Sequence, residues 1–166
     1  MITCAQTDNG IIQPMIPLKL RIAGFLSYHD PVELDFESFD LACISGQNGA
    51  GKSSLLDAIT WSLLGAARGK DKDALVNLQS KSAEVALTFA YEGNVYRVQR
   101  TATKGKSTVL EFQIAETRNS IFDNSENRQS NIELSNNVTW RPLTEKTNRE
   151  TQSRIEQTLR LDYETF

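Results

Sequence analysis

The alternation of apolar and polar residues predicts a sheet before any motif is considered. Apolar positions recur with a period of two over residues 18–23 and 32–36. This period puts successive side chains on opposite faces of a sheet, so both segments are predicted to be half-buried strands. Residues 85–91 and 96–100 alternate around Glu92-Gly93-Asn94, which predicts a β-hairpin. Two further strands are expected, at 110–114 after a turn at 104–106 and at 138–140.

A different pattern lies between the second strand and the hairpin. Residues 41–44 form a continuous apolar run, typical of a strand covered on both faces in the middle of an α/β sheet. Cys43 is therefore expected to be a buried small hydrophobe. Apolar residues then recur at helical spacing over 52–64, which predicts a helix that ends at Gly65.

The C-terminal part predicts one more helix. Thr147 and Glu150 have the spacing of a capping box, so a helix is expected from there to about residue 160. Its buried face would carry Ile155 and Leu159.

Two stretches lack such patterns. Residues 117–137 are rich in Asn and Ser, which predicts an insertion or a long hairpin tip with little core. Residues 1–14 are polar and unpatterned, and we interpret them as a flexible leader or an added extension. The organisation expected from these patterns is a single lobe over residues 15–166.

Composition excludes several classes of protein. With 18 basic and 21 acidic residues the net charge is −3, so any nucleic-acid surface must be a local patch. Two cysteines and one histidine argue against a disulfide framework and a zinc site. The apolar runs are too short for a membrane span, and no secretory signal is visible, so a cytoplasmic, nucleoid-associated protein is expected.

One segment matches a phosphate-binding motif at every fixed position. The pattern G-x-x-x-x-G-K-[ST] lies between the predicted buried strand and the predicted helix. Glycines let several backbone N–H groups point at one anion, and the helix N-terminus adds partial positive charge. Lys52 is expected to reach the β- and γ-phosphates of ATP, Ser53 to ligate Mg²⁺ and Ser54 to meet the α-phosphate region. The predicted nucleotide-binding residues of this segment are Gly46, Gln47, Asn48, Gly49, Ala50, Gly51, Lys52, Ser53 and Ser54.

Other parts of a complete P-loop hydrolase are not evident. The candidates for a Walker B strand, 32–35 and 159–162, are interrupted by charges. An Asn-Lys-x-Asp guanine-reading segment and the arginine-rich lid of a small-molecule kinase are also missing. The chain therefore either binds nucleotide without hydrolysing it or is part of a larger ATPase, and we favour the second.

Four segments together resemble the SbcC-type repair ATPases of the SMC-like ABC group. They are the opening strand at 15–28, the P-loop and helix at 44–59, the loop at 74–77 and the segment at 159–166. The resemblance implies an α/β P-loop fold, the N-terminal lobe of an ABC-ATPase head. That lobe has a mixed sheet, a P-loop helix and antiparallel hairpins, and it is incomplete without a C-terminal lobe.

The resemblance also implies partners and a mechanism. Two heads would form a homodimer around ATP, each completed by its own C-terminal lobe, and would control the access of double-stranded DNA to an SbcD-type nuclease. Ser27 and Val76 would border the nucleotide, whereas Leu26 stands where some relatives carry a nucleotide-contacting arginine. Lys104 and Lys106, and with them Arg97 and Arg100, are the candidates for DNA phosphate contacts. The alternatives are another SMC- or RecF-like head, a non-hydrolysing nucleotide-binding module and a P-loop kinase.

Overall fold

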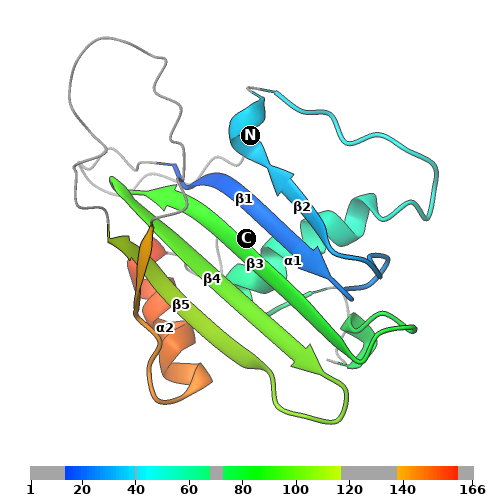
Figure 1. Cartoon of the computed structure of the whole chain (residues 1–166). Helices are drawn as coiled ribbons and strands as arrows, with labels where there is room; N and C mark the ends of the chain where they lie inside the picture. Colours follow the sequence, from blue (N-terminus) through cyan, green and yellow to red (C-terminus); the bar gives the residue numbers. More distant parts are fainter. Residues whose placement is uncertain (1–13, 40, 68–72, 117–137, 161–166) are drawn as a thin grey trace.

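A computed structural model describes residues 14–39, 41–67, 73–116 and 138–160 (Figure 1). The insertion predicted over 117–137 and nearly all of the predicted leader lie outside these residues. In chain order the elements are β1 (Ile16–Ala23), β2 (Val32–Asp35), the 3₁₀ turn η1 (Phe36–Ser38), α1 (Lys52–Leu64), the 3₁₀ turn η2 (Asp73–Leu75), β3 (Ser82–Tyr91), β4 (Asn94–Thr103), β5 (Val109–Glu116), β6 (Thr139–Pro142) and α2 (Asn148–Leu159).

The strands form one sheet in the order β2-β1-β3-β4-β5-β6, and every pair of neighbours is antiparallel. All the strands predicted from alternation are present, and the hairpin is confirmed as β3 and β4. The register aligns a row of apolar residues across four strands, namely Leu20, Leu87, Val98 and Phe112. Both helices lie behind this sheet in the view of Figure 1, on the face to which the row points.

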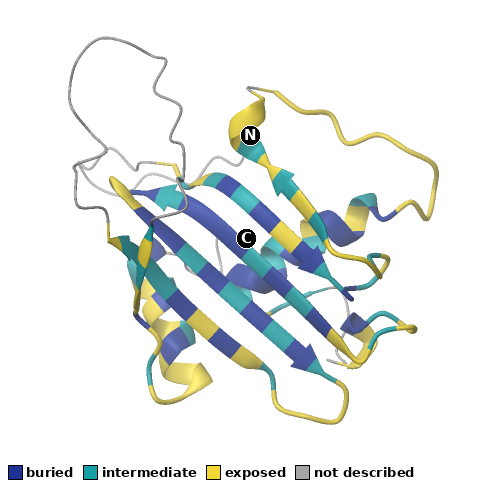
Figure 2. Cartoon of the chain, viewed as in Figure 1, coloured by how far each residue is buried: buried dark blue, intermediate teal, exposed yellow. Residues whose placement is uncertain are grey.

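The core lies between the sheet and the two helices. Leu87, Val98 and Phe112 are fully buried there, and the rings of Phe25 and Trp61 lie 5.3 Å apart at the junction of β1 with α1. The opposite face of the sheet shows intermediate and exposed positions between the buried ones (Figure 2). Period-two alternation thus produced the two unlike faces that it predicted.

Helix α1 ends as predicted but buries a different face. Gly65 adopts a φ of 70° as the C-cap and donates its N–H to Trp61 O at 2.9 Å. The buried stripe contains Leu55, Ala58 and Trp61, whereas Leu56 is 53% exposed. Successive helical residues are separated by about 100°, so Leu56 cannot share the stripe of Leu55.

The strand predicted at 41–44 is not formed. Leu41 is 91% and Ile44 50% exposed, and Cys43 is exposed rather than buried. A strand covered on both faces needs neighbouring strands, and β2 pairs here only with β1. The α/β class with a P-loop helix and antiparallel hairpins is confirmed, but no parallel strand joins the sheet within the residues described.

Helix α2 begins with the predicted capping box. Thr147 Oγ1 accepts the Glu150 N–H at 3.2 Å, and a carboxylate oxygen of Glu150 accepts the Thr147 N–H at 3.1 Å. Ile155 and Leu159 are buried, as expected. The sequence pattern therefore predicted both the start and the packing face of α2.

A buried arginine joins both helices to the sheet. Arg100 on β4 is 6% exposed and donates Nε–H to Ser62 O of α1 at 2.9 Å. It also donates to Gln152 of α2, whose amide donates to Leu63 O at 3.1 Å. Burial lowers the pKa of Arg100 to about 10, against an opposing effect of Glu156. The DNA contact predicted for Arg100 is therefore wrong, because its guanidinium is enclosed between the helices and the sheet.

Candidate functional site

The glycine-rich loop between residues 45 and 51 is exposed up to its last residue. Ala50 N–H donates to Gln47 O at 3.2 Å and closes a turn within it. Gly49 has a φ of 86° and Gly51 a φ of 90°, a region that side-chain-bearing residues rarely adopt. A Cβ on Gly51 would also lie 3.3 Å from Ser27 Cβ, whereas a Cβ on Gly49 would meet open space. Gly51 is thus the position at which glycine is required twice over.

Lys52 folds back over the loop. Its Nζ donates to Gly46 O at 2.7 Å and to Gln47 O at 2.8 Å. The positive charge is therefore held at the mouth of the loop by neutral carbonyls and is not neutralised by a carboxylate in these contacts. An anion entering the loop could replace the carbonyls as the acceptor, because a charged acceptor makes a stronger hydrogen bond with an ammonium group.

The first turn of α1 is suited to an anion. Its N-cap is Gly51, which makes no side-chain capping bond, and the first turn contains no acidic residue. The N–H groups of a helix's first turn lack partners inside the helix, and the helix dipole adds partial positive charge there. Ser53 is exposed on this turn, and Ser54 is buried with its Oγ 3.1 Å from Ser27 Oγ.

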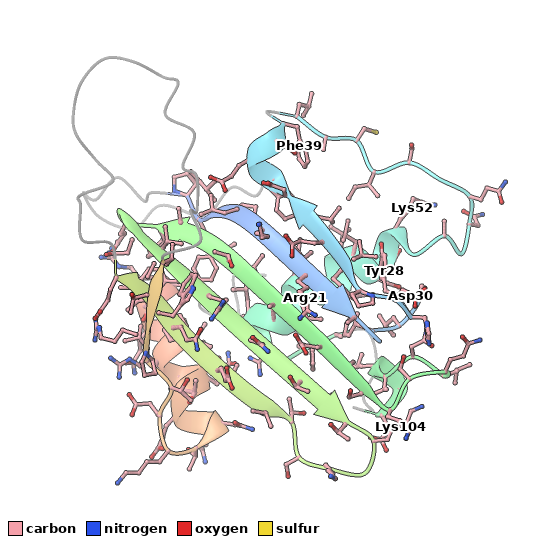
Figure 3. All side chains as sticks on the ribbon, in the orientation of Figure 1. Arg21, Tyr28, Asp30, Phe39, Lys52 and Lys104 are labelled. Atoms are coloured by element: carbon pink, nitrogen blue, oxygen red, sulfur yellow. The ribbon has the colours of Figure 1, made fainter. Side chains whose placement is uncertain are left out.

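A tight turn between β1 and β2 supports the start of α1. Tyr28 N–H donates to Phe25 O at 2.8 Å, and Leu26 has a φ of 46°. The Tyr28 hydroxyl donates to Gly51 O at 3.3 Å. Figure 3 shows Tyr28 beside the start of α1, at the same end of the helix as Lys52. The role of this hydroxyl was not anticipated from the sequence, because no spacing rule links Tyr28 to Gly51.

The residues present fit magnesium only together with a phosphate. In the part of the chain that the structure describes, no three His, Cys, Asp or Glu residues gather as a metal site. The Ser53 hydroxyl is exposed next to the loop, and Mg²⁺ is commonly held by one or two protein oxygens plus phosphate oxygens and waters. Asp35, the acidic residue of one Walker B candidate, instead accepts the Glu37 N–H at 3.0 Å.

The remaining predicted residues are dispersed. Val76 is 3% exposed and forms a β-bridge with Phe25, so its side chain belongs to the core and offers a nucleotide no surface. Arg97 lies on the open face of the sheet, where its guanidinium carbon is 4.3 Å from the centre of the Trp140 ring. These two residues are not brought to the loop.

The predicted basic turn lies at the other end of the β3–β4 strands from their hairpin. Lys104 Nζ donates to Asn77 O at 3.2 Å and to Ser80 O at 3.0 Å, and the Lys104 N–H donates to Lys81 O at 3.3 Å. Lys81 and Lys106 are exposed. Lys81 was not singled out from the sequence, because only the register of β3 with β4 brings it beside Lys104 (Figure 3).

Comparison with known proteins defines the class. A family model described as "AAA domain" matches residues 19–166, and the chain belongs to this family. It is similar to SbcC, the large partner in the SbcCD nuclease of Deinococcus radiodurans, with 33% identity over 155 residues, which is 92% of this chain and 15% of that protein. It is also 38% identical over 90 residues to a probable DNA double-strand break repair Rad50 ATPase of Aquifex aeolicus, covering 52% of this chain and 9% of that protein.

These matches confirm the resemblance to SbcC-type ATPases. They also show that the chain spans only a small part of the length of the curated relatives it matches. A solved structure of the recombination mediator protein RecF-ATPrS of the RecFOR pathway shares the fold. Its TM-score is 0.52 at 21% identity, over 61% of this chain and 27% of that one. Among the described residues, no helix has the length and apolarity needed to cross a membrane.

Proposed function

We propose that this chain is the ATP-binding part of an SbcC-like ATPase head that acts on double-stranded DNA ends. The observation that carries the proposal is the glycine loop leading into the uncapped, acid-free N-terminus of α1 with Lys52 at its mouth. Family membership and the SbcC and Rad50 relatives support it.

In this proposal the chain's own groups bind and orient the triphosphate. The loop N–H groups and the first turn of α1 surround the phosphates, while Lys52 exchanges its two carbonyl partners for phosphate oxygens. Ser53 supplies a hydroxyl to a magnesium ion that bridges the phosphates and neutralises their charge. Ser54, held by Ser27, fixes the end of the loop next to them.

Hydrolysis needs groups that the described residues do not supply. Beyond the P-loop, the ATPase reaction requires a residue that positions water and an acidic residue that helps to hold Mg²⁺. We propose that a C-terminal lobe of the same head and a second head supply them, so that ATP closes a homodimer and hydrolysis opens it. The exposed apolar run at 41–44 supports this, because it has the composition of an inner strand and no strand partner here.

We propose two further partners on weaker structural support. Double-stranded DNA would contact the basic turn formed by Lys81, Lys104 and Lys106, since the cations of the open sheet face are partly neutralised by pairs such as Lys19–Glu33 and Arg21–Glu84. An SbcD-type nuclease would be regulated by the opening and closing of the heads. The alternative of a RecF-like head is favoured by one observation, the fold shared with RecF.

The test of the proposal is magnesium-ATP binding by the whole chain, followed by backbone amide resonances of residues 45–54. We expect these resonances to shift on addition of nucleotide. Lys52→Ala should weaken binding roughly 10- to 150-fold, the effect of losing charged hydrogen bonds. Lys106→Ala is the matched control, an exposed lysine outside the loop that should leave affinity unchanged.

A second stage adds the complementary lobe, made separately. Hydrolysis should then appear and should disappear again in Lys52→Ala. Amide resonances that do not respond to nucleotide, even with the complementary lobe present, would contradict the proposal. Hydrolysis by the 166-residue chain alone at an ordinary enzyme rate would instead indicate a self-contained enzyme.

A further inference from the structure

The turn between β1 and β2 contacts the start of α1 at two points. Ser27 Oγ lies 3.1 Å from Ser54 Oγ, on the first turn of the helix. Gly51 O accepts two hydrogen bonds, from Leu55 N–H at 3.1 Å, the first of the helix, and from the Tyr28 hydroxyl at 3.3 Å. The position of this turn therefore sets where the helix begins and how its free N–H groups are aimed.

The turn is itself held from behind by one side chain. Leu26 has a φ of 46°, an unfavourable region for a residue with a side chain, so its conformation depends on its surroundings. Leu26 N–H donates to Leu75 O at 2.9 Å, and Leu26 O accepts Asn77 Nδ2–H at 2.6 Å. Asn77 N–H also donates to Gly24 O at 2.8 Å, at the base of the same turn.

The Asn77 side chain is fully committed to this arrangement. Its Oδ1 accepts Gln79 N–H at 3.0 Å while its Nδ2 donates to Leu26 O. A backbone donor on one side and a backbone acceptor on the other allow only one orientation of the amide. No charged or β-branched side chain could replace both functions.

We infer that Asn77 is a positioning residue of the nucleotide site. It holds Leu26 in its left-handed conformation, and through Ser27 and Tyr28 it keeps the first turn of α1 aimed at the bound phosphates. Asn77 touches neither the loop nor the nucleotide in this scheme. The inference rests on the proposed function for its consequence, but not for the structural link itself.

The most selective variant is Asn77→Asp. It has nearly the same shape and keeps the oxygen that accepts Gln79 N–H, but it places a second oxygen against Leu26 O. Asn94→Asp is the matched control, because Asn94 Nδ2–H also donates to a backbone carbonyl, Glu92 O at 3.2 Å. Asn94 lies in the β3–β4 turn, at the opposite end of the sheet from the loop.

With nucleotide present, we expect Asn77→Asp to weaken magnesium-ATP binding about threefold to tenfold, and Asn94→Asp to leave it unchanged. The loss should shrink in a chain that already carries Ser27→Ala and Tyr28→Phe, since those changes remove the link to α1. A thermal melt of each variant corrects the affinities for any unfolded fraction. Unchanged affinity, or an equal loss in both backgrounds, overturns the inference.

Without nucleotide, the same variants test the link directly by hydrogen exchange. The Leu55 amide, bonded to Gly51 O, should exchange several-fold faster in Asn77→Asp than in Asn94→Asp, relative to core amides of β4. Equal protection in the two variants overturns the inference whether or not ATP binds. A chain that shows the exchange difference but binds no ATP contradicts the proposed function and leaves Asn77 as the support of the α1 start.

Discussion

The hairpin strands β3 to β5 and the segment at 41–44 are both apolar in sequence and have opposite fates in the structure. Leu87, Val98 and Phe112 are fully buried, whereas Leu41 is 91% exposed. Each hairpin strand pairs with the next across a short turn, so its partners are local. A central α/β strand has parallel neighbours that come from distant parts of a chain. Apolarity shows that a segment needs cover, but it does not show that the cover is at hand.

The contrast also separates the two functions of the molecule. The hairpin sheet is a self-sufficient support, with α1 and α2 packed on one face (Figure 1). The 41–50 segment carries the ligand-binding loop and lies at the surface (Figure 2). Binding residues commonly lie on loops that a rigid scaffold positions, and here the scaffold reaches the loop through the turn at 25–28.

The largest expected effect lies in the sheet core. Phe112→Ala should lower the free energy of unfolding by about 3–5 kcal/mol, because it removes a fully buried ring and leaves a cavity. Chemical denaturation followed by circular dichroism measures this change. Leu41→Ala is the control and should stay within about 0.5 kcal/mol. Similar losses in both variants would mean that the two regions do not differ in the way described.

A smaller loss is expected where the helices meet the sheet. Arg100→Met keeps much of the buried volume but leaves Ser62 O and Gln152 without their donor, which should cost about 1–3 kcal/mol. The same denaturation experiment applies. Arg141→Met, at an exposed pair with Glu116, should have little effect. An unchanged or raised stability in Arg100→Met would show that Arg100 is not what joins α1 to α2.

Loss of the α2 cap should be smaller again. Thr147→Ala removes the acceptor of the Glu150 N–H and should destabilise the chain by about 1 kcal/mol. Helical ellipticity and the unfolding midpoint both report it, with Ser153→Ala, an exposed position within α2, as the control. A loss as large as that of Phe112→Ala would place α2 in the core of the fold and not at its edge.

The smallest effect sharpens the comparison most. Ile44→Ser should change the stability of this chain by less than about 0.5 kcal/mol, because Ile44 is half exposed and joins no strand. The same change should weaken association with a separately made C-terminal lobe, measured by titration calorimetry. Unaltered association would show that the 41–44 run is not covered by that lobe.

Much of this structure could be predicted from local pattern. The hairpin, the capping box of α2 and the glycine stop of α1 depend on contacts between residues close in sequence, and all three are confirmed. The burial of Arg100 and the exposure of Leu56 could not be predicted in this way. Each depends on which helix face meets the sheet, a property of the packing that neither position reveals alone.

The sequence by itself determined the strands, the helices and the identity of the glycine loop, because periodicity, capping and the need for positive φ act within a few residues. Only the tertiary structure decided that Asn77 lies behind Leu26, that Tyr28 reaches Gly51 and that Lys81 lies beside Lys104. These contacts join residues 23 to 51 positions apart, in the cases of Tyr28 and Asn77. Such distances in sequence are closed by sheet register and helix packing, which no local pattern encodes.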